Sequence, residues 1–384
     1  MDNIRNRGAA RHLPKPIPER IKEAREASGY TLDGFADAIG KSRQALAQFE
    51  TGQTSPSGET LSRIIALTGQ PLSFFVSMPL RPGNAGTIFW RSLKRMEQHH
   101  RKRIARRLQW AADVAILADE FIELPEADIP HWDFDPETAD DHDIEEAAEF
   151  LRGYWGLGIG PISNLANVLE SKGVIIVRES VGCPDMDGVS CWINGKPFIL
   201  LSAEVKSGPR DLFNLAHELG HIFLHSLVEV NDKNLTNIEK QANRFASAFL
   251  MPMESFSKEV FGTSLDFFKT LKKRWGVAIA AMAYRCKDLN IITDNQLSYI
   301  FRQLNAQKIR KVEPLDDAFS VAHPKVLGEA IRMLVEHGVC KRSEIESKLG
   351  LNLRDVESLC GVEPGYLDMK VVSVQFRPTA VNSY

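Results

Sequence analysis

The sequence lacks closely spaced cysteines, long apolar runs and an apolar stretch at its N-terminus. Its five cysteines are scattered over 384 residues without a C-x-x-C pair, so neither a disulfide framework nor a cysteine-bound zinc knuckle is expected. No apolar run approaches the ~20 residues that cross a bilayer. Residues 1–16 contain no apolar core of the kind that a secretory signal carries. These absences predict a cytoplasmic protein with reduced thiols and no membrane partner.

The chain also lacks an excess of charge of either sign. It has 47 basic and 50 acidic residues and a formal net charge of −3, so any nucleic-acid contact must come from a local patch. Its 43% of hydrophobic and 25% of charged residues are ordinary for a soluble globular protein. The length favours two or three domains over one.

The patterns along the chain predict a multidomain protein that is mainly α-helical and has a small β-sheet. Glycine and proline positions and changes of charge divide the chain into five parts. These are a flexible arm at 1–16, a domain of short helices at 17–79, a charged helical linker at 80–143, a mixed α and β domain at 144–311, and a C-terminal helical region at 312–384.

Three apolar, β-branched runs predict the strands of the mixed domain. They lie at 173–180, 189–193 and 198–202. The dipeptide Asn194-Gly195 separates the last two runs, and this dipeptide is a strong signal for a hairpin turn.

The linker begins with a strongly basic stretch. Residues 90–110 hold eight arginines and lysines against one acidic residue, Glu97. Such a run could add contacts to DNA phosphates. We instead expect a solvated connecting helix, because runs of charge usually form one.

Two helices near the N-terminus have the spacing of a helix-turn-helix. Thr31 is placed to cap the helix TLDGFADAIG, Gly40 supplies a tight turn, and Ser42 is placed to cap SRQALAQFE. The exposed start of the second helix would carry side chains that suit base edges and phosphates. These candidate DNA-binding residues are Lys41, Ser42, Arg43, Gln44 and Gln48.

The same stretch resembles the Cro/C1-type (XRE) helix-turn-helix domain. The likeness rests on R-x-x-x-G-x-T at 25–31, S-R-x-x-L-x-x-F-E-x-G at 42–52 and S-P-S-x-E-T-L at 55–61. The resemblance implies binding to double-stranded operator DNA, and domains of this type usually bind two half-sites as a homodimer. The alternative is a small helical module that contacts another protein.

The stretch LFNLAHELGHIFLH at 212–225 contains H-E-x-x-H. On a helix His217 and His221 lie on one face, where both imidazoles can bind a single Zn²⁺. Glu218 is then placed as the general base that takes a proton from water. The apolar residues around the motif predict a buried helix, in which these polar groups need a partner such as a metal.

A third metal ligand must come from outside the motif. Glu239 lies on the next predicted helix. Asn243, one turn later, could hydrogen-bond a metal ligand and so orient it without touching the metal. His225 continues the histidine stripe and competes for the third position. We favour Glu239, since three ligands on one helix cannot easily surround a tetrahedral ion, and we assign His225 a supporting role.

HELGHIFLH together with IEKQANRFASAFLMP resembles the ImmA/IrrE metallopeptidases, over about residues 145–310. The resemblance implies a gluzincin-like zinc endopeptidase with His217, His221 and Glu239 as ligands and Glu218 as general base. Family members typically cleave or inactivate transcriptional repressors in phage, mobile-element or stress responses. The strand at 198–202 is a candidate edge that would hold an extended substrate by strand addition.

Cys183 raises the hypothesis of a latency switch. A thiolate in the loop before the hairpin could occupy the open zinc position until it is displaced or oxidised. The alternative is an inert loop cysteine.

Two functions remain after this reading of the sequence. The first is a DNA-binding regulator that cleaves a repressor or itself. The second is a DNA-binding repressor whose peptidase-like domain only senses or scaffolds. The intact H-E-x-x-H motif and Glu239 favour the first, because a scaffold has no need of Glu218 as a general base.

Overall fold

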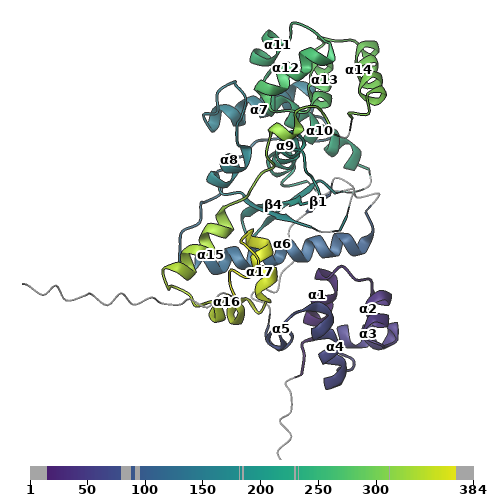
Figure 1. The fold of residues 1–384 in the computed structure, drawn as a ribbon, viewed down its shortest axis with the longest axis vertical. Coiled ribbons are helices and arrows are strands. Elements are labelled where there is room, and N and C mark those ends of the chain that lie inside the picture. Colours follow the sequence, from purple (N-terminus) through teal and green to yellow (C-terminus); the bar gives the residue numbers. More distant parts are fainter. Residues whose placement is uncertain are drawn as a thin grey trace, which may run out of the picture.

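The computed structural model describes residues 15–78, 88–90, 96–180, 182–183, 186–228, 231, 233–310 and 312–368. The expected arm at 1–16 therefore lies almost wholly outside the described residues. Helices dominate, and one small sheet stands near the middle of the molecule (Figure 1). This confirms the predicted fold class. No helix within the described ranges is long and apolar enough to cross a membrane.

The N-terminal helices begin at the capping residues that the sequence indicated. The side chain of Thr31 accepts a hydrogen bond from the Gly34 amide, and that of Ser42 accepts one from the Ala45 amide. Gly40 has a φ of 67°, as the predicted tight turn requires. The helices are α1 Pro18–Ala27, α2 Leu32–Ala38, α3 Arg43–Glu50, α4 Gly58–Thr68 and α5 Leu72–Val76.

The sheet has four strands in the order β1-β3-β4-β2. They are β1 Ile88–Trp90, β2 Ile175–Glu179, β3 Gly188–Ile193 and β4 Lys196–Ser202. The three predicted strands are confirmed. Asn194 and Gly195 join β3 to β4 with φ values of 53° and 77°, as a type I′ hairpin turn demands.

The prediction that 198–202 forms a free edge is wrong. β4 pairs with β3 on one side, antiparallel, and with β2 on the other, parallel. Both rows of its backbone groups are therefore occupied. A short strand inside the expected linker, β1, pairs with the outer side of β3.

The two faces of the sheet bury two hydrophobic cores. Alternating side chains of β4 show the division: Phe198 and Leu200 face one core, and Ile199 and Leu201 face the other. The first core joins the sheet to α6, the N-terminal helices and the C-terminal helices. The second joins it to the helices of the mixed domain.

The helices around the second core stand above the sheet in Figure 1. α9 and α10 are buried along most of their length and pack closely on each other. The set comprises α7 Asp141–Tyr154, α8 Leu165–Ser171, α9 Gly208–Leu224, α10 Leu235–Leu250, α11 Met253–Glu259, α12 Leu265–Trp275, α13 Ile279–Asp288 and α14 Asp294–Ala306. A single 3₁₀ turn, Asp316–Ala318, follows them.

The described part of the basic stretch, 98–110, belongs to a helix with a buried face, while residues 91–95 lie outside the described residues. α6, Gln98–Asp119, runs beneath the sheet, with the N-terminal helices below it and the C-terminal helices at its left part (Figure 1). Its side chains Ile104, Leu108 and Trp110 are at most 2% exposed. The expectation of a solvated connector is therefore wrong for this helix.

The described part of the C-terminal region, 312–368, contains three helices that pack against α6. Its helices are α15 Val326–Glu336, α16 Arg342–Leu349 and α17 Leu353–Cys360. All three contact α6, and α15 and α17 also contact β2. These three helices thus pack against α6, and two of them also pack against the sheet.

Arg107 shows how charge is accommodated in this first core. Its Nε donates to Glu179 Oε2 at 2.6 Å, and its other nitrogens pair with Glu179 and Asp355. Burial alone would lower the pKa of Arg107, but these two carboxylates raise it. Gln70 at the end of α4 also bonds Asp355, over 2.5 Å. One ion cluster therefore ties α4, α6, β2 and α17 together.

Candidate metal centre

The helix α9 carries H-E-x-x-H into the second core. Ser207 caps it by accepting from the Arg210 amide, and Pro209 stands in its first turn. Gly220, inside the motif, allows α10 to approach: a Cβ there would lie 3.0 Å from Phe245 and 3.3 Å from Ala242. The residue just before His221 is therefore small because the second helix lies against it.

Three side chains converge where α9 meets α10. His217 Nε2 and His221 Nε2 are 3.0 Å apart. Each lies 3.4 Å from a carboxylate oxygen of Glu239. These three residues form a group whose ligand atoms all lie within 4.8 Å of one another. The structure thus brings together the three residues that the sequence suggested as metal ligands.

The donor set and its spacing fit a zinc ion. Tetrahedral ligands about 2.0–2.1 Å from Zn²⁺ stand about 3.3 Å apart, which is close to the separations here. Glu239 Oε1 is buried and has no hydrogen-bond partner among the described residues. A buried carboxylate oxygen of this kind needs a cation or a donor. Two imidazoles and one carboxylate are also a typical protein ligand set of catalytic zinc.

Asn243 determines which ring nitrogen of His217 carries the proton. The amide nitrogen Nδ2 of Asn243 donates to the backbone carbonyl of Glu239 at 2.8 Å. The amide oxygen Oδ1 therefore faces His217 Nδ1, at 3.1 Å. That oxygen can only accept a hydrogen bond. The proton of neutral His217 is therefore on Nδ1, and Nε2 is unprotonated, which is the form that binds a metal.

A longer chain of hydrogen bonds determines which ring nitrogen of His221 carries the proton. Gln241 Nε2 donates to the Pro136 carbonyl at 2.9 Å, which leaves Gln241 Oε1 to accept from His225 Nε2 at 3.1 Å. His225 Nδ1 is then unprotonated and accepts from His221 Nδ1 at 3.1 Å. His221 Nε2 is unprotonated as a result. The sequence suggested that His225 supports the site, but it did not identify Gln241 or Pro136.

The pKa values of His225 and Glu239 are both lowered in this centre. Burial, together with the neighbouring His221, lowers the pKa of His225 to about 3, so His225 is neutral. Burial would raise the pKa of Glu239, but His217 and His221 outweigh it and hold that pKa at about 2. Glu239 is thus an ionised carboxylate, and His225 is a neutral imidazole.

Glu218 is held beside the centre by β3. The Ser190 hydroxyl lies 2.7 Å from Glu218 Oε2 and donates to it. Gly188 leaves room for the carboxylate, because a Cβ there would lie 3.2 Å from Glu218 Oε1. Ser190 and Gly188 could not be identified from the sequence, since they lie about 30 residues before Glu218 and only the sheet brings them to it.

Cys183 is not brought to this centre. It belongs to the first core, on the face of the sheet that packs against α6, whereas α9 packs on the other face. The group of possible metal ligands found in the described part of the chain does not include it. Its proposed role as a latency thiol gains no support from this position.

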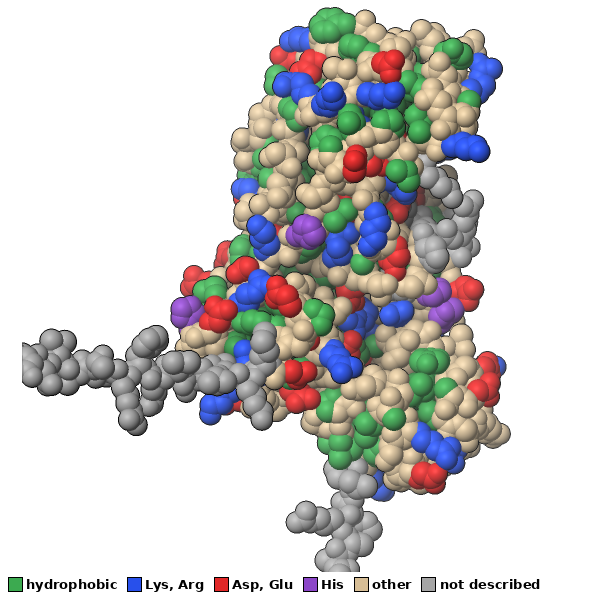
Figure 2. Space-filling view, in the orientation of Figure 1, with side chains coloured by type: hydrophobic (Ala, Val, Ile, Leu, Met, Phe, Trp, Pro, Cys, Tyr) green, Lys and Arg blue, Asp and Glu red, His purple; other side chains and the backbone are tan. Residues whose placement is uncertain are grey.

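The candidate DNA-binding residues lie at the start of α3. Lys41, Ser42, Arg43 and Gln44 are exposed, and Gln48 is half-buried. The Ser42 hydroxyl caps α3, and the Arg43 guanidinium lies 3.2 Å from the exposed carboxylate of Asp33. Basic and acidic side chains are interspersed on the face in Figure 2, in keeping with the near-balanced charge.

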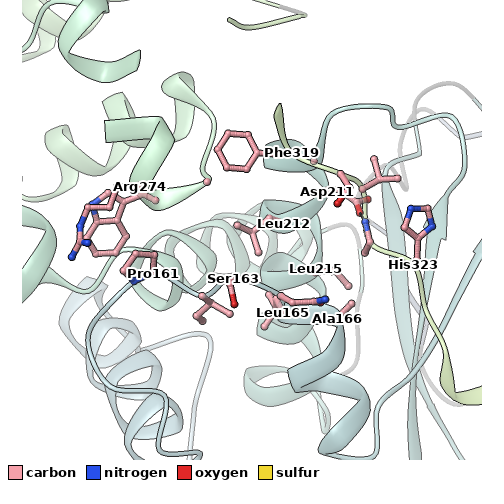
Figure 3. Close-up of a pocket in the computed structure, with 18 of the residues that line it drawn as sticks. Pro161, Ser163, Leu165, Ala166, Asp211, Leu212, Leu215, Arg274, Phe319 and His323 are labelled. Atoms are coloured by element: carbon pink, nitrogen blue, oxygen red, sulfur yellow. Dashed lines mark hydrogen bonds between the residues drawn. The ribbon is translucent and has the colours of Figure 1, made fainter. Parts of the chain in front are cut away.

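Two cavities adjoin α9. One, of about 570 Å³, includes Asn243 in its wall, next to His217, and its lining combines Phe213, Ala281 and Tyr284 with charged side chains. The other, of about 520 Å³, is shown in Figure 3, where Asp211, Leu212 and Leu215 of α9 face Arg274 and Phe319. The candidate metal ligands line neither cavity directly, but the first lies beside them.

The fold and this centre define a class of protein: a helix-turn-helix domain joined to a domain with a metallopeptidase-like histidine and glutamate site. Residues 21–75 match the helix-turn-helix family. Residues 169–287 match the IrrE N-terminal-like domain of the M78 peptidase family. The chain is thus a fusion of an XRE-type helix-turn-helix domain with an M78-family domain, which confirms the two resemblances.

Two relatives with curated names match a short part of the chain. The HTH-type transcriptional regulator SutR of Escherichia coli is 32% identical over 68 residues, which are 18% of this chain and 38% of that protein. A prophage-derived HTH-type transcriptional regulator of Bacillus subtilis, YonR, is 31% identical over 58 residues, which are 15% of this chain and 54% of that protein. The chain thus spans about half or less of the length of these relatives.

A solved structure of a Mycobacterium tuberculosis transcriptional regulator also aligns with the chain. The match has 18% identity and covers 46% of this chain and 50% of that one, with a TM-score of 0.29. A TM-score this low does not establish a shared fold.

Proposed function

We propose that this chain is a DNA-binding regulator whose M78-family domain is a zinc-dependent endopeptidase. The substrate we propose is a transcriptional repressor or the chain itself. The observation that supports this most is the convergence of two imidazoles and Glu239 next to the carboxylate of Glu218. A domain without chemistry has no use for that second carboxylate.

The residues of the centre divide the work of peptide hydrolysis. His217, His221 and Glu239 would hold zinc, which supplies Lewis-acid activation of water and of the peptide carbonyl when bound. Glu218 accepts a proton from the attacking water and passes it to the leaving amine. The Ser190 hydroxyl holds one oxygen of Glu218, so that the carboxylate keeps a single orientation.

The cavity of about 570 Å³ beside Asn243 is the place for a substrate side chain. Its lining includes Phe213, Ala281 and Tyr284 together with Arg210 and Lys240. Three acidic side chains, Asp141, Asp187 and Asp288, also line it, so the cavity suits a large apolar side chain without a preference for charge of one sign. This cavity is preferred over the one in Figure 3 because it adjoins the partner of His217.

The N-terminal domain would direct the chain to DNA. The exposed Lys41, Arg43 and Gln44 at the start of α3 suit phosphates and base edges in the major groove. Two copies binding two half-sites would form a homodimer on an operator. Two relatives of the chain carry the name of HTH-type transcriptional regulators, which supports this part of the proposal.

Glu218→Gln tests the catalytic part, because it keeps the shape of the side chain and removes the base. We expect cleavage of fluorescein-labelled denatured casein, and any self-cleavage seen by mass spectrometry, to fall by about 10²–10⁴-fold. Zinc content should stay that of the unaltered chain. If transcription from the target promoter is unaffected while zinc stays bound, the domain acts as a sensor or scaffold instead.

A further inference from the structure

The outer edge of β3 is occupied by a segment from outside the peptidase domain. β1, Ile88–Trp90, comes from the connector between the helix-turn-helix domain and α6. It pairs antiparallel with β3, with Phe89 opposite Ser190 and Trp90 opposite Val189. The sheet edge on this side is thus closed by the chain's own connector.

This edge is the one that lies next to the candidate catalytic carboxylate. Ser190, opposite Phe89, donates its hydroxyl to Glu218, and Gly188 lies against the same carboxylate. The other side of β3 is filled by β4, and β4 is filled by β2. An extended polypeptide that reaches Glu218 by adding a strand to the sheet must therefore take the place of β1.

The pairing of β3 with β4 shows which backbone groups face β1. The two-residue turn closes on the pair Ile193 and Lys196, and hydrogen-bonded and non-hydrogen-bonded pairs alternate from there. Pro197, which has no N–H, stands opposite Trp192 in a non-hydrogen-bonded pair, as this alternation requires. Ser190 therefore turns its N–H and C=O away from β4 and toward Phe89.

We propose that Ile88–Trp90 occupies the peptide-binding edge of the M78-family domain, so that the connector competes with an extended polypeptide for Ser190. The proposal rests on the peptidase function given above. β1 has only three residues. Its pairing with β3 therefore depends on the covalent link between them, which gives β1 an effective concentration in the millimolar range at the edge of β3. When β1 separates from β3, the outer edge of β3 becomes available to another polypeptide.

Phe89→Pro separates this role from a general loss of structure. The substitution removes the Phe89 N–H and points the proline ring at the Ser190 carbonyl. Trp90→Pro is the matched control: it also replaces an aromatic residue with proline, but the Trp90 N–H belongs to a non-hydrogen-bonded pair and faces away from β3. The two variants differ in which backbone group they remove.

Hydrogen exchange of the full-length chain measures the occupancy of the edge. The Ser190 amide should exchange slowly in the unaltered chain and in Trp90→Pro, and at least tenfold faster in Phe89→Pro. Fast exchange of Ser190 in the unaltered chain would overturn the proposal, because β1 would then not hold the edge in solution.

Binding of fluorescein-labelled denatured casein measures the competition. In zinc-loaded chains that also carry Glu218→Gln, Phe89→Pro should bind the casein about tenfold more tightly than Trp90→Pro, as loss of a tethered competitor implies. Equal binding by the two would refute the competition. Casein that binds tightly but is not cleaved by Phe89→Pro with Glu218 intact would leave the occupied edge supported and would refute the peptidase function.

Discussion

Gln241 is expected to control the metal affinity of a centre that it does not touch. In Gln241→Leu the shape of the side chain is roughly kept, but the acceptor of the His225 N–H is lost. His225 can then carry its proton on Nδ1 instead, where it faces His221 Nδ1 at 3.1 Å. His221 must shift its own proton to Nε2 or turn away, and either change removes a metal ligand in its binding form.

The expected effect is a loss of about 10–100-fold in zinc affinity, the usual result of removing a group that orients a ligating histidine. That range corresponds to about 1.4–2.7 kcal/mol. The upper part applies here because His221 and His225 are fully buried, so that no water can replace the lost acceptor. Gln241→Glu keeps an acceptor for His225 and should retain most of the affinity.

Zinc competition with a chromophoric chelator measures the affinity of each purified variant. Asn237→Leu is the matched control, because Asn237 also donates to the Pro136 carbonyl, at 2.6 Å, and lies one turn before Gln241 on α10. We expect the control to bind zinc like the unaltered chain. Equal affinities for Gln241→Leu and the control would refute the relay through His225.

Three further outcomes are expected. Arg107→Met leaves Glu179 buried without its partner and should lower the free energy of unfolding by about 3 kcal/mol, seen as a lower midpoint in urea. Gly188→Ala places a methyl group 3.2 Å from Glu218 Oε1 and should slow casein cleavage about tenfold or more, since a misplaced base loses much of its effect, with zinc affinity unchanged. Gln44→Ala should weaken operator binding in a mobility-shift assay by about 1–3 kcal/mol, and less for unrelated DNA.

The sequence identified the parts of the site that depend on the period of one helix. His217, Glu218 and His221 follow from the spacing of α9, and Glu239 and Asn243 follow from the next helix. Their chemistry is local, because helical spacing alone decides which of them share a face. The binding of zinc and the catalytic roles stay predictions.

The parts that the sequence did not identify depend on contacts between distant segments. Gln241 acquires its role from Pro136, 105 residues away, and Arg107 is buried because Glu179, 72 residues away, pairs with it. A count of basic residues cannot show such a partner, so α6 was expected to be solvated. Alternating burial likewise gives the faces of β4 but not its neighbours in the sheet, which led to the wrong edge strand.

The packing of the N-terminal helices on α6 determines whether the two pieces stay together after the backbone is cleaved between α5 and α6. Trp110 Nε1 donates to Glu23 at 2.7 Å, the Phe74 and Trp110 rings are 6.0 Å apart, and Arg106 pairs with Glu26 at 2.9 Å. None of these contacts depends on an intact backbone between α5 and α6. A chain nicked in the connector would therefore give two bands in a denaturing gel but elute as one particle under native conditions. Cleavage in the connector would therefore release the new chain ends at the cut, while the N-terminal domain stays bound to α6.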